Sequence, residues 1–373
     1  MKIAIDVSRI VNEKAGIGRC TSELVRALLK IDKKNRYLLI CTFIRGEKSK
    51  KALMETFAQK NVEIKYLKLP GKLKETIWHS RLPIVKKILA GADVYLAPTF
   101  LDVITNLAIP QVVIIHDLST FRFPQHLGKK LAIYFDRQTE VATRLAKKII
   151  CISESTKRDL IKILHVEPKK IQVIYPGNAL LPPAAANLPA GLKSRAYILT
   201  VGTLEPRKNF SSLFKAYALL PLELQEQHPL VVVGGKGWNT GEIFELILQL
   251  KLDDKVKFLG HVDDKVLAKL YQEAEIFVYP SLYEGFGLPV LEALGFGLPV
   301  ITSNTSSLPE VVGEAGVLID PTEPKSIARA LQHLLEHKNI ARKLSQAAFS
   351  QAKKFSWKTT AIDVLKLLES LVE

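Results

Sequence analysis

Short, almost uninterrupted apolar runs recur along the first half of the chain, and they constrain its fold more than any other feature. Three examples are KIAIDV from Lys2, QVVIIHD from Gln111 and KIICIS from Lys148. A strand with one face in water alternates polar and apolar residues, so these runs are typical of strands buried on both faces of a parallel sheet. Helical stretches such as residues 131–148 separate the runs. The alternation predicts strand and helix repeats around a doubly wound sheet.

The pattern stops at LLPPAAANLPAGLKSR, which begins at Leu180, and it restarts at YILTVGT, which begins at Tyr197. Prolines and small residues without a helical period are typical of a linker between domains. We therefore expect an α/β protein with two Rossmann-like, doubly wound domains that face a cleft. Ligands of such sheets bind beyond the carboxyl ends of the strands. The expected division is an N-terminal domain over 1–182, a linker over 183–194, a second domain over 195–354, and a C-terminal helix over 355–373 that could pack back on the first domain.

Several classes of protein are disfavoured by simple counts. No apolar run approaches the roughly 18 residues that cross a bilayer, and Asp6 interrupts the start where a signal peptide needs an apolar stretch. We therefore expect a cytoplasmic protein. Cys20, Cys41 and Cys151 are odd in number and widely spread, which argues against a disulfide framework and a zinc cluster. We expect them to be small buried residues.

The charge of the chain is concentrated in its first half. Residues 1–190 hold 33 Lys and Arg against 16 Asp and Glu, a net +17, whereas residues 191–373 hold 20 against 21. A basic half suits phosphate-bearing partners or an anionic membrane surface, but a solvated lysine surface explains it equally well. A nucleic-acid-binding protein is a weaker alternative, since the cations lack the clustered aromatic residues on which bases stack.

The stretch KLKETIWHSRLPIVKK, from Lys72, mixes Ile77, Trp78 and Leu82 with cationic side chains. It fits an amphipathic helix that lies on anionic lipid. It equally fits an ordinary helix whose apolar face belongs to the core.

The hexapeptide GFGLPV occurs twice, from Gly285 and from Gly295. No further copy exists, so a repeat architecture is excluded and each copy needs its own explanation. The first copy follows a predicted strand and predicts a glycine loop and a helix that begins near Pro289. The amides at such a helix start can receive an anion or sugar hydroxyls. The second copy ends the same helix and leads into the next strand.

Two glutamates flank the first copy. Glu284 opens the loop, and Glu292 is expected in the first turn of the helix, so both could point into the cleft. Carboxylates accept hydrogen bonds from paired hydroxyls, as on a hexose or a ribose. Alternatively, Glu292 only favours the amino end of the helix, and Glu284 only caps the loop.

EGFGLPVLE, followed by GLPVITSNTSSLPEVVGEAGVLIDP, resembles the signature of a large family of retaining glycosyltransferases with the GT-B fold. The family includes enzymes similar to sucrose synthase and glycogen synthase, and bacterial polysaccharide mannosyltransferases. The likeness spans the chain and is strongest from Val201 to Pro321. It implies that Glu284 binds hydroxyls of the donor sugar and that Glu292 binds the nucleotide ribose. It also implies that three amides line the sugar and phosphate, those of Phe286, Gly287 and Leu288.

VGTLEPRKNF places Arg207 and Lys208 on a loop after the first strand of the second half. Fixed cations there can neutralise a diphosphate leaving group. The resemblance implies this role for both residues. Many members carry an arginine directly after the glycine, where this chain has Thr203, so Arg207 departs from the usual position.

Further candidates come from three loops. His116 follows a buried strand, and the resemblance implies a catalytic or substrate-positioning role, although a histidine can also be purely structural. Gly16 and Gly18 precede a helix, where the family's glycine loop approaches the donor phosphates. GHVDD, from Gly260, resembles the loop whose backbone reads the nucleobase, which implies a contact through Val262. For Asp263 and Asp264 we expect helix capping.

The resemblance implies a retaining glycosyltransferase that moves a hexose from a nucleotide sugar to a glycan or lipid-linked glycan acceptor in surface polysaccharide synthesis. HDLSTFRFP and GTLEPRKN are most similar to bacterial mannosyltransferases, so GDP-mannose is the expected donor. UDP-glucose, UDP-N-acetylglucosamine and a nucleotide-sugar epimerase are the alternatives. We expect no cofactor and no essential metal, since cations and helix amides would stabilise the phosphates. Peripheral contact of the basic half with an anionic membrane is an additional hypothesis.

Overall fold

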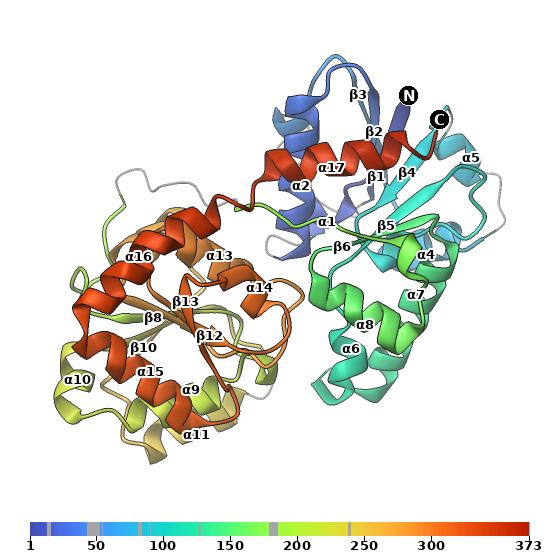
Figure 1. The fold of residues 1–373 in the computed structure, drawn as a ribbon. Helices are drawn as coiled ribbons and strands as arrows, with labels where there is room; N and C mark the ends of the chain where they lie inside the picture. The colour runs from blue at the N-terminus through green and yellow to red at the C-terminus, as the bar shows by residue number, and fades with distance from the viewer. Residues whose placement is uncertain are drawn as a thin grey trace. The chain divides into compact units, whose positions relative to one another are not determined.

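The structure is a computed structural model that describes residues 1–12, 16–42, 53, 55–80, 84–89, 91–126, 128–178, 186–237 and 240–372. The chain divides into two compact units (Figure 1). Unit 1 comprises Met1–Gly177 and Ser356–Glu373, and unit 2 comprises Asn178–Phe355. Each unit contains its own parallel sheet, which confirms the prediction of two doubly wound domains.

The sheet of unit 1 has the order β3-β2-β1-β4-β5-β6-β7, and all of its neighbouring strands are parallel. Strands β1 to β3 extend the sheet from its centre to one edge, and strands β4 to β7 extend it from the centre to the other edge. The order therefore reverses between β1 and β4. The strands are β1 (Lys2–Asp6), β2 (Arg36–Thr42), β3 (Val62–Leu67), β4 (Val94–Ala97), β5 (Gln111–Ile115), β6 (Lys148–Cys151) and β7 (Ile171–Val173).

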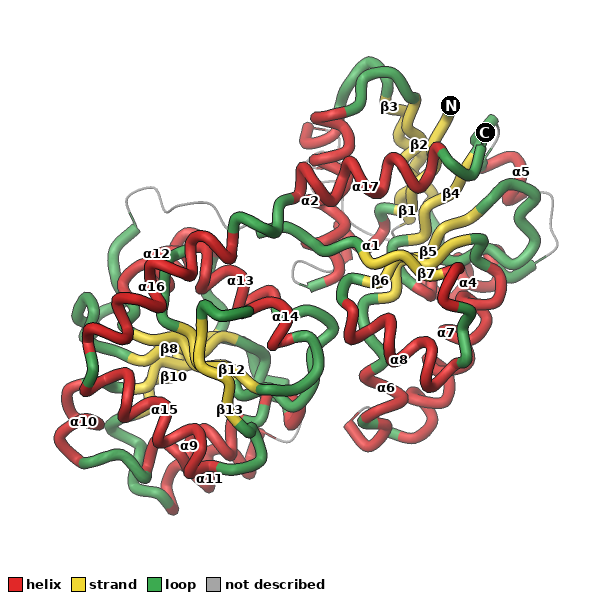
Figure 2. The backbone as a smooth tube through the Cα atoms, viewed as in Figure 1, coloured by secondary structure: helices red, strands yellow, loops and turns green. Residues whose placement is uncertain are grey.

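Helices cover both faces of this sheet (Figure 2), so the strands are buried on both sides. In β1, Ile3 and Ile5 belong to one hydrophobic core, and Ala4 belongs to the core on the other face. This division explains the lack of polar alternation in the run from Lys2. The helices are α1 (Ser8–Asn12), α2 (Ile17–Ile31), α4 (Gly71–Trp78), α5 (Ile84–Ile88), α6 (Ser119–Arg122), α7 (Lys129–Leu145), α8 (Glu154–Leu164) and α17 (Trp357–Glu369), with short 3₁₀ turns η1 (Phe100–Asp102), η2 (Pro124–His126) and η3 (Pro168–Lys170).

Unit 2 repeats the same topology with the sheet order β10-β9-β8-β11-β12-β13. Its strands are β8 (Ile198–Val201), β9 (Leu230–Val233), β10 (Val256–Gly260), β11 (Ile276–Tyr279), β12 (Val300–Ser303) and β13 (Gly316–Ile319). Its helices are α9 (Phe210–Ala218), α10 (Leu222–Gln227), α11 (Thr240–Gln249), α12 (Asp264–Glu273), α13 (Leu288–Gly295), α14 (Leu308–Val312), α15 (Pro324–Glu336) and α16 (Lys338–Ala352), with the 3₁₀ turn η4 (Pro206–Lys208).

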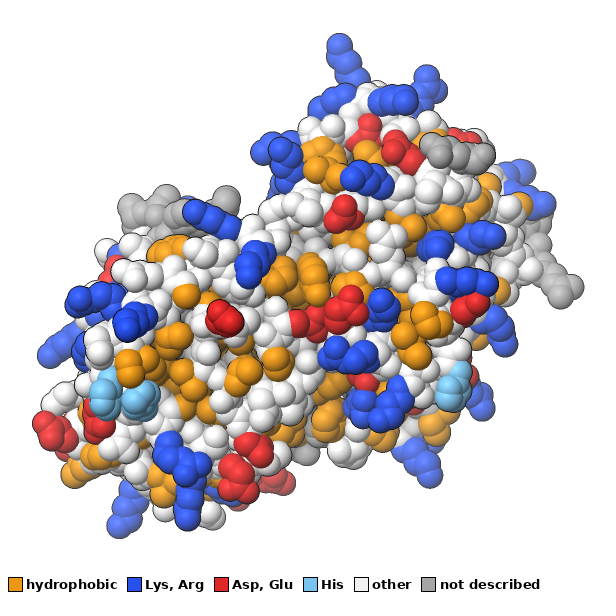
Figure 3. Space-filling model, viewed as in Figure 1, with side chains coloured by type: hydrophobic (Ala, Val, Ile, Leu, Met, Phe, Trp, Pro, Cys, Tyr) orange, Lys and Arg blue, Asp and Glu red, His pale blue; other side chains and the backbone are white. Residues whose placement is uncertain are grey.

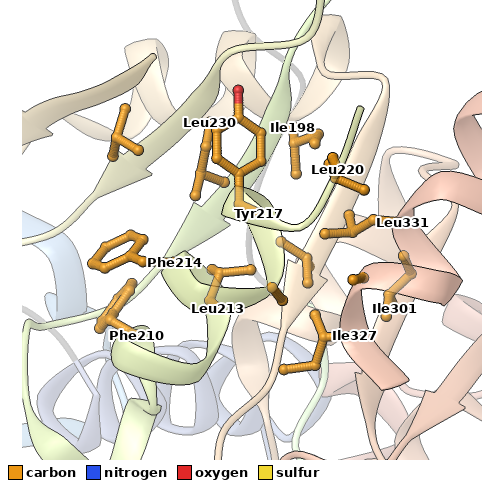
Figure 4. Close-up of a cluster of buried hydrophobic side chains, with 14 of the residues drawn as sticks. Ile198, Phe210, Leu213, Phe214, Tyr217, Leu220, Leu230, Ile301, Ile327 and Leu331 are labelled. Carbon is orange, nitrogen blue, oxygen red and sulfur yellow. The ribbon is translucent and has the colours of Figure 1, made fainter. Parts of the chain in front are cut away.

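The core of unit 2 is formed by side chains from α9 and α15 that pack on the sheet (Figure 4). Phe214 and Tyr217 of α9 are fully buried, as is Leu331 of α15. Tyr217 keeps its hydroxyl satisfied because it donates to main-chain oxygens of the segment that ends α10. This packing fixes β8 and β11 at the centre of the unit.

The chain returns to unit 1 at its end. Helix α17 packs on α2, and the Thr360 hydroxyl donates to the carbonyl of Tyr175 at 2.7 Å. The last helix therefore belongs to unit 1. Of the linker expected over 183–194, residues 183–185 lie outside the described residues, and the rest forms turns and irregular backbone.

The apolar side chains of helix α4 are divided between the core and the surface. Ile77 and Trp78 are buried in a core, whereas Leu73 is exposed, and Leu82 lies outside the described residues. The ammonium of Lys74 is also buried, 2.8 Å from Asp6 and 2.7 Å from Asp102. The burial of Ile77 and Trp78 agrees with the alternative of an ordinary helix whose apolar face belongs to the core, while Leu73 and Ile84 of this stretch are exposed.

The structure also shows the surroundings of the three cysteines, the character of the helices and the distribution of cationic side chains. Cys20, Cys41 and Cys151 are free and buried, as expected. Among the described residues, no helix combines the length and apolar character that crossing a membrane requires. Lys and Arg side chains are scattered over the face shown in Figure 3.

We predict that Gly177→Ala destabilises the protein, because an added methyl group would lie 2.1 Å from the backbone nitrogen of Trp357 at the start of α17. Overpacking of this kind costs about 1–3 kcal/mol. Urea unfolding should show the loss. Gly71→Ala is the control, since its methyl group would meet nothing within 4 Å. Equal stability of both variants would contradict the close packing of Gly177 on α17.

Candidate functional site

The candidate site lies where the strand order of unit 2 reverses. Strands β8 and β11 are neighbours there, and their carboxyl ends lead into the loops that carry Arg207, Lys208 and Glu284. At this point of a doubly wound sheet the flanking helices diverge, so ligands commonly bind here. The fold therefore brings Glu284 next to Arg207 and Lys208, which lie 77 and 76 positions before it in the sequence.

The carboxylate of Glu284 is buried between two cations. Its Oε1 lies 2.6 Å from Nζ of Lys208, and its Oε2 lies 2.9 Å from Nη1 of Arg207. Burial alone would raise the pKa of this carboxyl group, but the charges of Arg207 and Lys208 outweigh it and lower the pKa to about 2. Glu284 is therefore ionised at neutral pH and can only accept hydrogen bonds.

The two oxygens of Glu284 are not equivalent. Oε1 accepts hydrogen bonds from the Tyr279 hydroxyl at 2.9 Å and the Ser281 hydroxyl at 2.6 Å, in addition to Lys208. Oε2 accepts from Arg207. A carboxylate oxygen can accept about two hydrogen bonds, so Oε1 is saturated and Oε2 can accept from a hydroxyl of a bound molecule.

Both cations of the site are already paired with carboxylates. Arg207 bridges Glu284 and Glu205, the latter at 2.7 Å. Lys208 also donates to the Tyr279 hydroxyl at 2.6 Å, and burial, its largest perturbation, lowers its pKa although the charge of Glu284 acts in the opposite direction. Arg207 is the more exposed of the two cations.

The glycine loop after Glu284 has the form that the sequence predicts. Gly287 adopts φ +105°, and an added side-chain carbon would lie 2.7 Å from Leu308. Both the backbone conformation and the lack of space therefore require glycine at this position. Ser307 fixes the loop by donating to the carbonyls of Glu284 and Phe286. Within the described part of the chain, the amides of Gly287 and Leu288 make no hydrogen bond, which leaves two donors at the start of α13.

Glu292 lies elsewhere than predicted. Helix α13 begins at Leu288, so Glu292 is its fifth residue and sits in the second turn rather than the first. Its carboxylate accepts a hydrogen bond from the Tyr271 hydroxyl of α12 at 3.0 Å. The prediction of a first-turn position was wrong because the helix starts one residue before Pro289. The second hexapeptide copy ends this helix at Gly295, as predicted.

Aromatic residues connect the surroundings of the two glutamates, and sequence reasoning missed them. Tyr271 packs on Phe277, and Phe277 stacks on Tyr279, with ring centroids 5.5 and 5.9 Å apart. Tyr279 and Ser281 stand at the end of a predicted strand, where ligand contacts are common, and that position was the available signal.

The candidates of the first half lie in unit 1. His116 follows β5, and its Nε2 is 2.9 Å from the carbonyl oxygen of Pro98. Gly16 adopts φ +57° directly before α2. Gly18 lies inside the first turn of α2, so its prediction as a loop residue before the helix was wrong. Residues 13–15 lie outside the described residues.

Val262 is half-buried on the loop between β10 and α12. Asp263 caps α12, since its side chain accepts from the amides of Lys265 and Val266 at 2.9 Å each. The capping role predicted for Asp263 is confirmed.

Comparison with known families gives a match in each half of the chain. Residues 190–351 match the family described as glycosyl transferases group 1, and residues 15–178 match glycosyltransferase family 4. An Escherichia coli protein, O-antigen chain mannosyltransferase B, is 35% identical over 267 residues, which is 69% of this chain and 70% of that protein.

Two solved structures share the fold over the whole chain. Sucrose-phosphate synthase from Thermosynechococcus elongatus has a TM-score of 0.78 and 22% identity, and the alignment covers 100% of this chain and 99% of that one. HepE from Anabaena, solved in complex with UDP-glucose, has a TM-score of 0.73 and 21% identity with complete coverage of both chains.

We predict that Glu284 makes the stability of unit 2 depend on pH. Its folded-state pKa of about 2 lies below its ordinary value of 4.5, so its ionisation stabilises the fold above about pH 4.5 and loses this effect as the pH falls towards 2. Glu284→Gln should therefore lower the unfolding free energy by about 3 kcal/mol at neutral pH and by progressively less in acid. Urea unfolding at a series of pH values measures this. A difference that stays constant with pH would contradict it.

Proposed function

We propose, since this chain belongs to the group 1 glycosyltransferase family, that it transfers a hexose from a nucleotide sugar to a glycan or lipid-linked glycan in surface polysaccharide synthesis. The observation that carries the proposal is the buried cluster of Glu284, Arg207 and Lys208 where the strand order of unit 2 reverses. An ionised carboxylate, fixed cations and a helix start with two available amides suit a molecule that joins sugar hydroxyls to a diphosphate.

Glu284 would bind the donor sugar through Oε2. This assignment is supported by the saturation of Oε1 by Lys208, Tyr279 and Ser281. Those three donors hold the carboxylate in one orientation, so a sugar hydroxyl that reaches Oε2 would meet an acceptor that needs no rearrangement. Preorganised acceptors and donors of this kind are more effective than mobile ones.

The diphosphate would be held by Arg207, Lys208 and the amides of Gly287 and Leu288. When the bond between sugar and phosphate breaks, negative charge grows on the departing phosphate, and fixed donors stabilise it. With these groups supplying that charge stabilisation, we propose that the enzyme needs no cofactor and no essential metal. The support is the donor set itself.

GDP-mannose is the proposed donor. Its support is the 35% identity to a protein named for mannose transfer to the O-antigen chain. UDP-glucose is the second candidate, because HepE has a similar fold and was solved with that nucleotide sugar. Retention of the anomeric configuration is proposed from the family resemblance alone.

The remaining roles are also proposals. His116 would position the transferred sugar or the acceptor, and its support is its place after β5, at the carboxyl edge of the unit 1 sheet. Glu292 would bind the ribose, and the backbone at Val262 would contact the base. Gly16 and Gly18 would allow the start of α2 to approach the phosphates.

We also propose that the basic half of the chain contacts an anionic membrane. Its support is the net charge of +17 over residues 1–190. Trp78 of α4 would take no part in this contact, since it is buried in the core.

We predict that Glu284→Gln and Lys208→Ala each reduce kcat by about a hundredfold to a thousandfold, because each removes a preorganised group from the reacting bond. Initial rates of sugar transfer measure the loss. Glu275→Gln is the matched control, since Glu275 is a largely buried carboxylate of unit 2 that pairs with His228 and Lys338, away from the cluster. Wild-type turnover in a cluster variant, or an equal loss in the control, would remove that residue from the site.

We also predict that a panel of nucleotide sugars gives the largest kcat/KM for GDP-mannose. The panel should include UDP-glucose and UDP-N-acetylglucosamine, with release of the nucleoside diphosphate as the readout. A clear preference for a UDP-sugar would overturn the mannose assignment and leave glycosyl transfer intact. Failure of every donor to bind would refute the proposed site.

A further inference from the structure

A cavity lies in unit 1, at the opposite edge of the sheet from His116. It has a volume of about 750 Å³ and lies against the amino ends of β5, β6 and β7. We call it the strand-start hollow and define it by its charged residues, which are Arg144, Lys147, Lys148, Glu167, Lys169 and Lys170. No role in sugar transfer accounts for it.

The hollow holds five cationic side chains and a single carboxylate. That carboxylate, Glu167, is paired with Lys169 at 2.6 Å. In the part of the chain that the structure describes, no carboxylate lies within ion-pair distance of the other four cations, which are Arg144, Lys147, Lys148 and Lys170. An exposed lysine surface usually mixes both signs of charge, so this group carries a local excess of positive charge.

Two of the cations are held in place by main-chain oxygens. Nζ of Lys148 donates to the carbonyl of Lys169 at 2.8 Å, and Nζ of Lys170 donates to the carbonyl of Arg144 at 3.0 Å. These bonds join the end of α7, the start of β6 and the turn η3, so they fix the cations without neutralising them. Burial is the main cause that lowers the pKa of Lys170; the charge of Glu167 opposes this shift, and the charge of Lys147 adds to it.

Apart from Gln111, the rest of the lining is apolar. It includes Leu107, Ile109 and Leu145, which are half-buried. A hollow with an apolar floor and a basic rim suits an anion that carries an organic group, because the charged end meets the cations and the carbon atoms meet the floor.

The hollow is separate from the transfer site. Gln111 begins β5 at the hollow, and Ile115 ends it before His116. Five strand residues span roughly 17 Å, so one ligand of ordinary size does not reach both edges. The cluster of Glu284 belongs to unit 2. The hollow would thus bind its ligand without occupying the site of the nucleotide sugar.

We propose that the strand-start hollow binds a phosphate ester. The ester is either part of an anionic lipid headgroup at a membrane surface or a small phosphorylated molecule in solution. The local excess of positive charge supplies the attraction in both cases. The proposed site lies at the amino ends of three strands and not on α4.

The test uses the full chain and two probes. Vesicle flotation with phosphatidylcholine alone and with phosphatidylcholine mixed with phosphatidylglycerol tests the lipid source, and calorimetry with glycerol 3-phosphate tests the soluble source. The wild type should bind the anionic vesicles or glycerol 3-phosphate and should not bind neutral vesicles. Binding of vesicles alone assigns a lipid headgroup, and binding of glycerol 3-phosphate assigns a soluble ester.

The variant for this test carries two substitutions together, Arg144→Gln and Lys147→Gln. The native side chains at both positions are exposed and make no ion pair in the described structure. It should weaken binding about tenfold. The control is the pair Lys129→Gln and Lys130→Gln, which removes the same charge from the other end of α7. Thermal unfolding of both double variants checks that they fold.

Equal weakening by both pairs would show that only net charge matters and would overturn the proposal. Failure of the wild type to bind either probe would also overturn it. If the wild type transfers no sugar but binds a probe through the hollow, the proposed function fails and this inference stands.

Discussion

Burial of one ionised carboxylate organises the second unit. Glu284 is 7% exposed and remains charged because Arg207 and Lys208 lie within hydrogen-bond distance. A buried charge without partners costs several kcal/mol, so the loops after β8 and β11 can adopt only those positions in which the pairs form. The sheet order makes these loops neighbours, and the charges then hold them together. Tyr279 and Ser281 add hydrogen bonds that determine how the carboxylate is oriented, so stability and binding geometry arise from the same contacts.

Unit 1 also buries charged side chains where its strand order reverses, but it arranges them differently. Asp6 ends β1, Asp102 follows β4, and the ammonium of Lys74 lies between their carboxylates. Burial raises the pKa of Asp6 although Lys74 opposes the shift. All three side chains are almost fully buried, so this group attaches α4 to the sheet and leaves no space for a ligand. In unit 2 the corresponding group is less completely buried, since the side chains of Glu284 and Arg207 are 9% and 19% exposed. Similar topology therefore yields an anchor in one unit and a candidate binding site in the other.

The accuracy of the sequence predictions depended on how local each feature is. Continuous apolar runs identified buried parallel strands, because a strand buried on both faces excludes polar alternation whatever surrounds it. The glycine loop before α13 was also predictable, since Gly287 needs a positive φ. Gly18 and Glu292 were misplaced because helix boundaries shift by one or two residues with tertiary packing. The stretch from Lys72 was ambiguous because an amphipathic pattern shows which side chains share a face and does not show what covers that face.

The sequence by itself determined two doubly wound α/β units, a glycine loop before a helix, and a likeness to retaining glycosyltransferases through Glu284 and Glu292. Only the tertiary structure decided which groups meet at Glu284, that Glu292 is bound by Tyr271, and that basic residues gather at the amino ends of three strands. The physical reason is that strand order brings together residues about 75 positions apart. Local propensity and periodicity contain no information about contacts at that separation, whereas hydrogen bonding and burial of charge depend on them entirely.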